Sequence, residues 1–91
     1  MNKFRVDMTS YIKYEAYDVF DENDKLVGYI KYSNGTLVCN PVIDGNVKRN
    51  VIVYWWQGGG IYDKNIPLDI RDELIDKCLC SLEDFYDKKN W

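Results

Sequence analysis

The dipeptide Asn34-Gly35 restricts the fold more than any other feature of this sequence, because a run rich in aliphatic and aromatic residues lies on each side of it. A type I′ turn requires positive φ at both central residues, and Asn-Gly adopts that geometry readily. The dipeptide therefore predicts a β-hairpin in which Ser33 faces Thr36. Continued outward, the same register pairs Tyr32 with Leu37, Lys31 with Val38, Ile30 with Cys39, and Tyr29 with Asn40.

A second hairpin is predicted directly before the first, with the polar loop at residues 21–25 joining a strand that ends at Phe20 to one that begins at Leu26. Direct pairing of Phe20 with Leu26 places apolar side chains of both hairpins on one face. That expected core face contains Ile12, Tyr14, Ala16, Phe20, Leu26, Ile30, Tyr32, Leu37 and Cys39.

The reverse face of the same two strands carries favourable cross-strand pairs, namely Val19 with Val27, Tyr17 with Tyr29, and Glu15 with Lys31. Asp18 does not fit this register, because it places a carboxylate on the apolar core face, opposite Gly28. We expect it to mark a bulge or the rim of the core.

Two further segments are typical of strands. Residues 51–56 have high β propensity, although the loop at residues 44–50 leaves their register open. Pro41 indicates an edge or a bulge nearby, since proline donates no ladder hydrogen bond. Residues 4–8 alternate in polarity and predict a short first strand.

The hydrophobic period changes to that of a helix from about Leu68 to Lys88, after Pro67, which suits a first helical turn. Spaced at about 100° per residue, the apolar side chains fill half of the helical wheel: Leu68, Ile70, Leu74, Ile75, Cys78, Leu79, Leu82, Phe85 and Tyr86. Arg71 falls inside this arc and is expected to extend its charged end to solvent. The opposite arc is acidic and holds Asp69, Asp72, Glu73, Asp76, Glu83, Asp84 and Asp87.

These patterns predict one α+β domain over residues 1–91, with residues 1–62 mainly β and residues 67–88 forming a carboxy-terminal amphipathic helix. The expected architecture is a four- or five-stranded antiparallel meander that a single carboxy-terminal α-helix packs against on one face. Leu74, Cys78, Leu82 and Phe85 are expected to meet the apolar side chains of the sheet.

The composition argues against most catalytic and metal chemistry, because the chain contains no histidine and only three cysteines. Cys78 and Cys80 are two residues apart on a helix, so they point away from each other and cannot hold one ion. The loop at residues 21–24 lacks the glycine and glutamate spacing of a calcium loop, and residues 58–60 lack the lysine and adjoining helix of a phosphate loop. We therefore expect no enzyme activity, no metal and no cofactor.

The net charge of −3 opposes direct binding of nucleic acid, and its distribution is uneven. Residues 1–62 carry seven acidic and seven basic side chains, whereas residues 63–91 carry eight and five. The first ten residues contain no apolar signal-peptide core, and no run approaches the roughly 18 apolar residues of a membrane span. The frequent Lys, Asn, Ile and Tyr and the single Ala are typical of an AT-rich coding sequence, which hints at a low-GC bacterium or one of its phages or plasmids. The chain is therefore expected in the cytoplasm of a bacterial host cell, without a membrane partner.

Eight tyrosines and three tryptophans exceed what a small core can hold, so several are expected at a binding surface. Tyr17 and Tyr29, with neighbouring valines, predict an apolar patch on the sheet face away from the helix. The alternative is that residues 1–10 or the carboxy-terminal tail cover this patch. Trp55 and Trp56 are the other aromatic candidates for a partner contact.

Four carboxylates of the helix, Asp76, Glu83, Asp84 and Asp87, form the leading candidate for a docking stripe toward a basic partner; the alternative is an ordinary solvated face. In size, acidity and layout the chain resembles small inhibitors encoded by phages and mobile elements, including anti-CRISPR and other anti-defence proteins. That resemblance implies a protein-binding module on a basic, nucleic-acid-handling surface of a bacterial protein. Two alternatives stay open: a single-stranded nucleic-acid or oligosaccharide binder with an aromatic sheet face, and a homo-oligomeric structural subunit, for example a homodimer.

Overall fold

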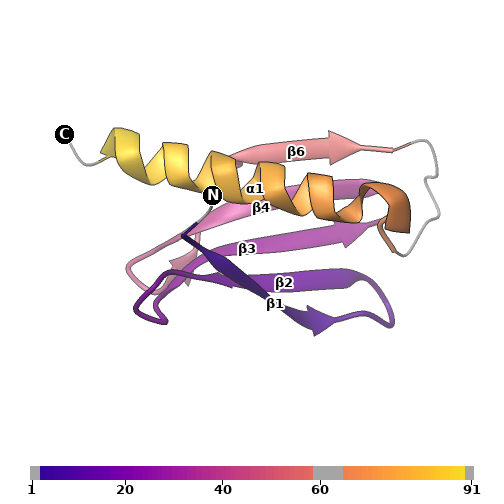
Figure 1. Ribbon diagram of the computed structural model, residues 1–91, viewed down its shortest axis with the longest axis horizontal. Coiled ribbons are helices and arrows are strands. Elements are labelled where there is room, and N and C mark those ends of the chain that lie inside the picture. The colour runs from indigo at the N-terminus through magenta and orange to yellow at the C-terminus, as the bar shows by residue number, and fades with distance from the viewer. Residues whose placement is uncertain (1–2, 59–64, 90–91) are drawn as a thin grey trace.

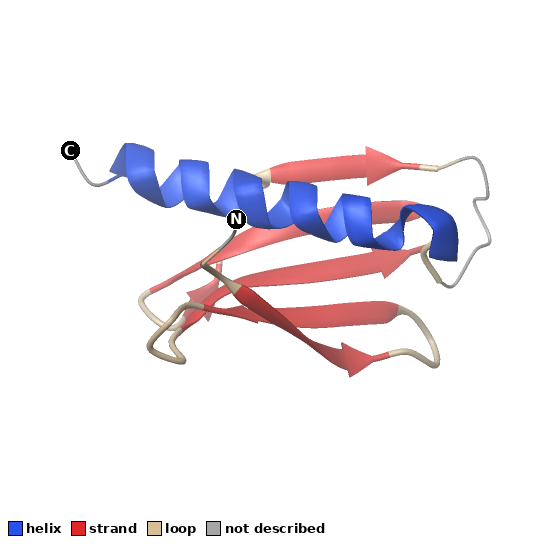
Figure 2. Cartoon of the chain, viewed as in Figure 1, coloured by secondary structure: helices blue, strands red, loops and turns tan. Residues whose placement is uncertain are grey.

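The computed structural model describes residues 3–58 and 65–89, and it contains one antiparallel sheet and one helix (Figure 1). The strands and the helix are β1 (Arg5–Ser10), β2 (Glu15–Phe20), β3 (Leu26–Ser33), β4 (Thr36–Ile43), β5 (Asn46–Val47), β6 (Tyr54–Gln57) and α1 (Leu68–Lys89). The helix lies across one face of the sheet, and the other face carries no helix in the described part of the chain (Figure 2). This confirms the predicted meander with a single carboxy-terminal helix.

Strands β1 to β4 pair in sequence order, and the free edge of β4 is shared by two short strands. β5 pairs with the end of β4, at Val42 and Ile43, while β6 pairs with its beginning, from Thr36 to Cys39. The segment at residues 51–53 is not a strand, so the predicted strand 51–56 begins later than expected. The predicted first strand is present and extends to Ser10.

The β3–β4 hairpin has the predicted register over its whole length, from Ser33 opposite Thr36 to Tyr29 opposite Asn40. Its two central residues have φ values of 52° and 80°, as a type I′ turn requires. Asp44 and Gly45 form a second turn of this kind between β4 and β5, with φ values of 54° and 79°.

The register expected between β2 and β3 is wrong by one residue, and a β-bulge is the cause. Phe20 pairs with Leu26 as predicted, but Val19 pairs with Gly28, which leaves Val27 as an extra residue. Beyond the bulge, Tyr17 lies opposite Ile30 and Asp18 lies opposite Tyr29. Because side chains alternate between faces, this shift sends Glu15, Tyr17 and Val19 to the helix side and Ala16 and Asp18 to the other side.

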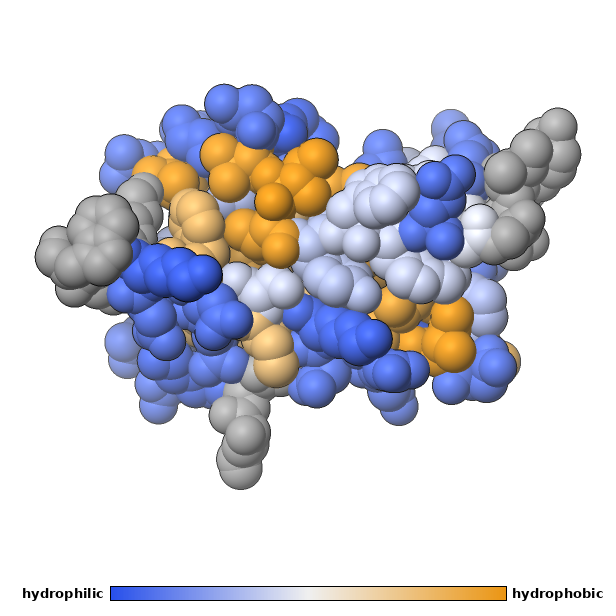
Figure 3. All heavy atoms as spheres, turned by 90° about the horizontal axis from the view of Figure 1, so that it is seen from above, coloured by the Kyte–Doolittle hydropathy of each residue, from blue (hydrophilic) through white to orange (hydrophobic). Residues whose placement is uncertain are grey.

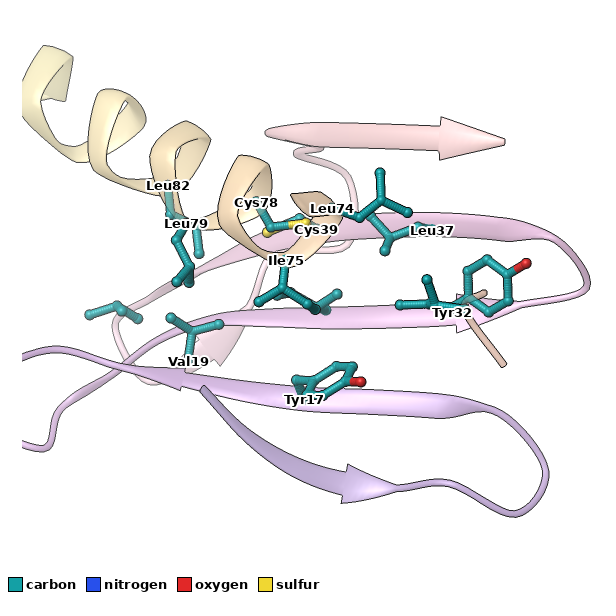
Figure 4. Packing of buried hydrophobic residues seen from close by; sticks show 13 residues of the cluster. Tyr17, Val19, Tyr32, Leu37, Cys39, Leu74, Ile75, Cys78, Leu79 and Leu82 are labelled. Carbon is teal, nitrogen blue, oxygen red and sulfur yellow. The ribbon is translucent and has the colours of Figure 1, made fainter. Parts of the chain in front are cut away.

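The core lies between the sheet and α1 and draws on β2, β3, β4 and the helix (Figure 4). Gly28 is the point of closest approach, since a Cβ at that position would lie 2.5 Å from Leu82 Cδ1. The buried members are Tyr17, Val19, Val27, Ile30, Tyr32, Leu37, Cys39, Ile66, Leu74, Ile75, Cys78, Leu79 and Leu82.

Several residues expected in the core lie elsewhere. Ile12 is 86% exposed in the loop before β2, and Leu68 is 78% exposed at the start of the helix. Tyr14 and Phe20 each stack under a cation, Lys31 and Arg5 respectively, instead of packing under the helix. Phe85 is half-buried and packs edge-on against the Tyr86 ring.

Candidate functional site

The acidic arc of α1 faces away from the sheet. Of the four carboxylates predicted to form a docking stripe, Asp76, Asp84 and Asp87 are exposed and Glu83 is half-buried. We call these four residues the acidic stripe. An ion pair between Lys77 and Glu73, 3.6 Å from nitrogen to oxygen, lies nearer the amino-terminal end of the same helix.

A hollow of about 250 Å³ borders the acidic stripe where the carboxy-terminal half of α1 passes the β2–β3 loop. Glu83 and Asp87 line it from the helix, and Asp21 and Glu22 line it from the loop. Its aromatic wall consists of Phe4 and Tyr86, whose rings meet edge-on at 6.4 Å. Lys3 and Lys25 are the basic residues of the lining, so carboxylates outnumber cations four to two among the described residues.

A second hollow, of about 310 Å³, lies on the other side of the acidic stripe, between the helix and the segment that precedes β6. Its apolar lining consists of Val51, Ile52, Val53 and Phe85, and its polar lining consists of Ser81, Asp84 and Lys88. Figure 3, which looks onto the side of the molecule where α1 and β6 lie, shows a hydrophobic area beside hydrophilic helix side chains. Apolar surface therefore adjoins the charged face.

The sheet face away from the helix carries a groove of about 410 Å³, which we call the outer groove. Three directly opposed pairs of β3 and β4 form its floor, and residues from the segment before β6 form one wall. The lining residues are Tyr29, Lys31, Ser33, Thr36, Val38, Asn40, Arg49 and Ile52. This surface is the one expected from the aromatic content, but with different residues.

Two cations of the outer groove lie over aromatic rings. Lys31 Nζ is 4.6 Å from the centre of the Tyr14 ring, and the Arg49 guanidinium carbon is 5.9 Å from the centre of the Tyr29 ring. Burial of the Tyr29 ring raises the pKa of its hydroxyl. Trp55 is 55% exposed on the same face, because it pairs with Val38.

Hydrogen bonds hold the wall of the outer groove against β4. The Asn40 side-chain amide donates to the carbonyl of Val51 at 2.8 Å, and the Val53 amide donates to the carbonyl of Cys39 at 2.9 Å. The Lys48 amide donates to the carbonyl of Pro41 at 2.9 Å. The wall is therefore fixed at both its ends and its middle.

Glu15 is the residue that sequence reasoning placed most wrongly, since it is fully buried rather than paired with Lys31 at the surface. Its carboxylate accepts hydrogen bonds from the Tyr17 hydroxyl at 2.5 Å, the Ile66 amide at 2.5 Å and the Arg71 guanidinium at 2.8 Å. Arg71 thus lies in the apolar arc to meet a buried charge, not to reach solvent. The sequence signalled only half of this pair, namely Arg71 inside the apolar arc of the helix, because the expected register placed Glu15 on the opposite face of the sheet.

The electrostatics of this cluster are those of a sealed structural site. Burial and the hydrogen bond to Glu15 raise the pKa of Tyr17, and the hydrogen bond to Glu15 raises the pKa of Arg71. The carboxylate has no exposed surface, so it cannot reach a solvent-borne substrate. Its role is structural, because its hydrogen bonds hold the chain before α1 and the first turns of α1 against β2.

Tyr86 fastens the other end of the helix. Its hydroxyl lies 2.6 Å from the carbonyl oxygen of Val27 and 2.7 Å from that of Val42, and these two oxygens share its one proton. The hydroxyl oxygen accepts from the Val42 amide at 3.2 Å. Burial raises the pKa of this phenol.

The remaining predicted partner-binding residues do not form one surface. Tyr17 is buried in the core, so the expected Tyr17 and Tyr29 patch does not exist; the bulge in β3 separates them onto opposite faces. Trp56 packs its ring at 6.3 Å from that of Tyr32 on the helix side, opposite to its neighbour Trp55. The acidic stripe is remote from Tyr29 and Trp55, because the sheet lies between them.

The cysteines occupy the predicted environments. Cys39 and Cys78 are buried against each other, and their hydrogen bond together with burial raises the pKa of Cys39; Cys80 is exposed. Residues 3–58 and 65–89 contain no group of three or more cysteines and carboxylates suited to holding a metal ion.

In the same ranges, no helix combines the length and apolar character that crossing a membrane requires. Of the glycine run at residues 58–60, Gly58 is described, and the other two lie outside the described residues.

No protein-family model matches this chain, and no curated protein and no solved structure matches it significantly. Its function must therefore be inferred from the surfaces described above.

Proposed function

We propose that this chain is a non-catalytic binding protein that uses the acidic stripe to occupy a basic, nucleic-acid-handling surface of a bacterial protein. The observation that carries the proposal is the position of the stripe between two hollows that each have an apolar wall. Protein interfaces commonly combine an apolar centre with a charged rim. The stripe supplies the rim, while Phe85 and the apolar segment at residues 51–53 supply anchoring surface.

The spacing of the carboxylates supports a charged partner with an extended site. Asp76, Glu83 and Asp87 are separated by seven and four residues, which places them on one line along the helix. The first and the last are 11 steps apart along the helix, or roughly 16 Å at about 1.5 Å per residue. A row of negative charge of that length suits a groove whose lysines and arginines otherwise bind phosphates.

The helix dipole disfavours two of these carboxylates. Negative side chains stabilise the amino-terminal end of a helix dipole, where Asp69 and Asp72 lie. Asp84 and Asp87 lie near the negative end, where the dipole disfavours them. A function in binding explains why acidic residues occupy these positions, and it fits an inhibitor of the phage or mobile-element type that acts in the bacterial cytoplasm.

The test replaces Asp76, Glu83 and Asp87 with lysine and measures association with the partner captured from the source cell. Steering by the stripe raises association rates at low salt, so the triple variant is expected to associate at least tenfold more slowly and with a flatter salt dependence. The matched control makes the same charge change at the other end of the helix, with Asp69, Asp72 and Glu73 replaced by lysine.

Circular dichroism must show that both variants keep the fold. Equal association rates for the wild type and the stripe variant would refute the docking stripe. Concentration-dependent sedimentation of the purified chain, with loss of self-association in the stripe variant, would instead favour a homo-oligomeric subunit.

A further inference from the structure

We infer that the outer groove binds a short segment of single-stranded nucleic acid, on the sheet face opposite the acidic stripe. Among the described residues that line the groove, the charged ones are Lys31 and Arg49, and both are basic. The chain as a whole has a net charge of −3, so a purely basic lining departs from the average surface. The local charge of this groove is complementary to phosphate.

The acidic character of the chain does not oppose binding at this face. The acidic excess belongs to residues 63–91, and the carboxylates of α1 point away from the sheet on its other side. The Debye length is about 8 Å at physiological salt, and the core and the sheet separate the two surfaces. Two carboxylates of the outer face lie toward β1: Asp18 is opposite Tyr29 in the register, and Asp7 is opposite Asp18.

Both cations have donors available for a phosphate. Neither forms an ion pair with a described carboxylate; each lies over an aromatic ring, at 4.6 Å for Lys31 and 5.9 Å for Arg49. A ring attracts a cation through its face but accepts no strong hydrogen bond, so the N–H groups stay available. The rings hold the cations in place and reduce the entropy lost on binding.

Flat apolar surface for a base is present beside these cations. Trp55 lies next to Val38 on the same face with 55% of its surface exposed, whereas Tyr29, on the floor of the outer groove, is half-buried beneath Arg49. Single-stranded nucleic acids bind by stacking bases on aromatic side chains while cations follow the backbone. The groove volume of about 410 Å³ lies within the range of about 300 to 1,000 Å³ typical of ligand sites.

The outer groove is also preformed. Its floor consists of the directly opposed pairs Tyr29 with Asn40, Lys31 with Val38, and Ser33 with Thr36. An acidic peptide could pair with the two cations, but it would leave the exposed Trp55 ring without a planar partner. The combination of fixed cations and this exposed ring therefore favours a nucleic acid over an acidic protein segment.

The test titrates the full-length chain into fluorescein-labelled dT10 and rU10 and follows fluorescence polarisation between 20 and 200 mM salt. With two cations engaged, log K against log salt should have a slope of about −1.4, at about −0.7 per phosphate for a single strand. Replacing both Lys31 and Arg49 with alanine should weaken binding at least tenfold and bring the slope near zero. Trp55→Ala should weaken binding roughly fivefold through lost stacking, with little change in slope.

The matched control replaces Lys25 and Lys77, two cations outside the groove, with alanine and is expected to bind as the wild type does. Unfolding midpoints of all variants check that the fold is retained. No binding of either oligonucleotide, or equal binding by the control and the Lys31 and Arg49 variant, would overturn the proposal. Equal competition by a poly-aspartate of the same charge would also overturn it, because the groove would then be a general site for acidic chains. None of these outcomes depends on the acidic stripe, so this test is independent of the proposed protein partner.

Discussion

The two ends of α1 are fastened to the sheet by different chemistry. The amino-terminal end is held by charge, because the carboxylate of Glu15 accepts from Arg71 and from the Ile66 amide just before the helix. The carboxy-terminal end is held by a neutral phenol, since the Tyr86 hydroxyl binds the backbone of β3 and β4. Both attachments join segments more than 40 residues apart in the chain.

This difference shows how unequal two hydrogen-bonded attachments can be. Loss of one partner from a buried ion pair leaves the other charge uncompensated, which costs about 3–5 kcal/mol. Loss of a neutral hydroxyl leaves carbonyl and amide groups that cost roughly 1–3 kcal/mol each when fully buried, and less where water can reach them. The amino-terminal attachment is therefore expected to be the more sensitive of the two.

The largest effect is expected for Glu15→Gln, which removes the charge while keeping the shape. Arg71 then faces a neutral amide, and we expect the free energy of unfolding to fall by about 3–5 kcal/mol. Urea unfolding followed by circular dichroism measures this change. Glu73→Gln on the same protein breaks only the exposed pair with Lys77 and should cost less than about 0.5 kcal/mol. Similar losses in the two variants would show that Glu15 is not buried.

A second substitution tests the packing between the two attachments. Leu82 is fully buried against Gly28, so Leu82→Ala should cost about 3 kcal/mol. The thermal midpoint reports the loss, and an unchanged midpoint would mean that the helix is oriented differently. Leu68→Ala, at an exposed site on the same helix, is the control and should change stability little.

Tyr86→Phe weakens the carboxy-terminal attachment alone. The ring remains to pack against Phe4, while the hydroxyl is lost from the carbonyls of Val27 and Val42. We expect a loss of about 1–2 kcal/mol. Hydrogen exchange should show faster opening in the last turns of α1 than in its first turns, and uniform acceleration would contradict two separate attachments.

The two attachments also predict an alkaline limit on stability. Burial raises the pKa of both Tyr17 and Tyr86 above the usual value of about 10, so the folded state holds these protons more tightly than the unfolded state. Their contribution is complete below pH of about 10 and is lost as the pH rises through the folded-state pKa values. The slope should approach about 1.4 kcal/mol per pH unit for each tyrosine. Tyr17→Phe and Tyr86→Phe should each remove one such contribution, and a slope that neither variant changes would exclude both phenols as its source.

The β3–β4 hairpin was predictable because turn chemistry alone determines its register. Asn34-Gly35 allows few geometries, and no irregularity interrupts the pairs that follow. The turn at Asp44-Gly45 carried an equally strong signal of the same kind. The fold class, the bounds of the helix and its exposed acidic arc were also predictable, because the spacing of apolar residues changes from that of strands to that of a helix.

The β2–β3 register was not predictable from its loop, because the loop defines only the first pair. The extra residue Val27 leaves one position of the ladder unpaired, but it allows tertiary contacts that a regular ladder would not. It turns Glu15 and Tyr17 toward Arg71, and it places Gly28 where Leu82 packs. A contact between residues 15 and 71 is not visible to reasoning that proceeds along one strand. The candidate surfaces were not predictable for the same reason, because the strand register decides which face each aromatic side chain is on. Tyr29 and Trp55 lie on the outer face, whereas Tyr17 and Trp56 lie on the helix side.

The meander order has a consequence for synthesis of the chain on the ribosome. Strands β1 to β4 pair with their sequence neighbours, so they can associate as soon as residue 43 has left the exit tunnel. The helix that covers them follows in the sequence, and Leu82 emerges almost 40 residues later. At the usual translation rate of about 5–20 residues per second, the apolar face of the newly formed sheet stays exposed to solvent for several seconds. During that interval a nascent chain offers Ile30, Leu37 and Cys39 to other proteins, so yield in the cell should depend on how quickly translation reaches the helix.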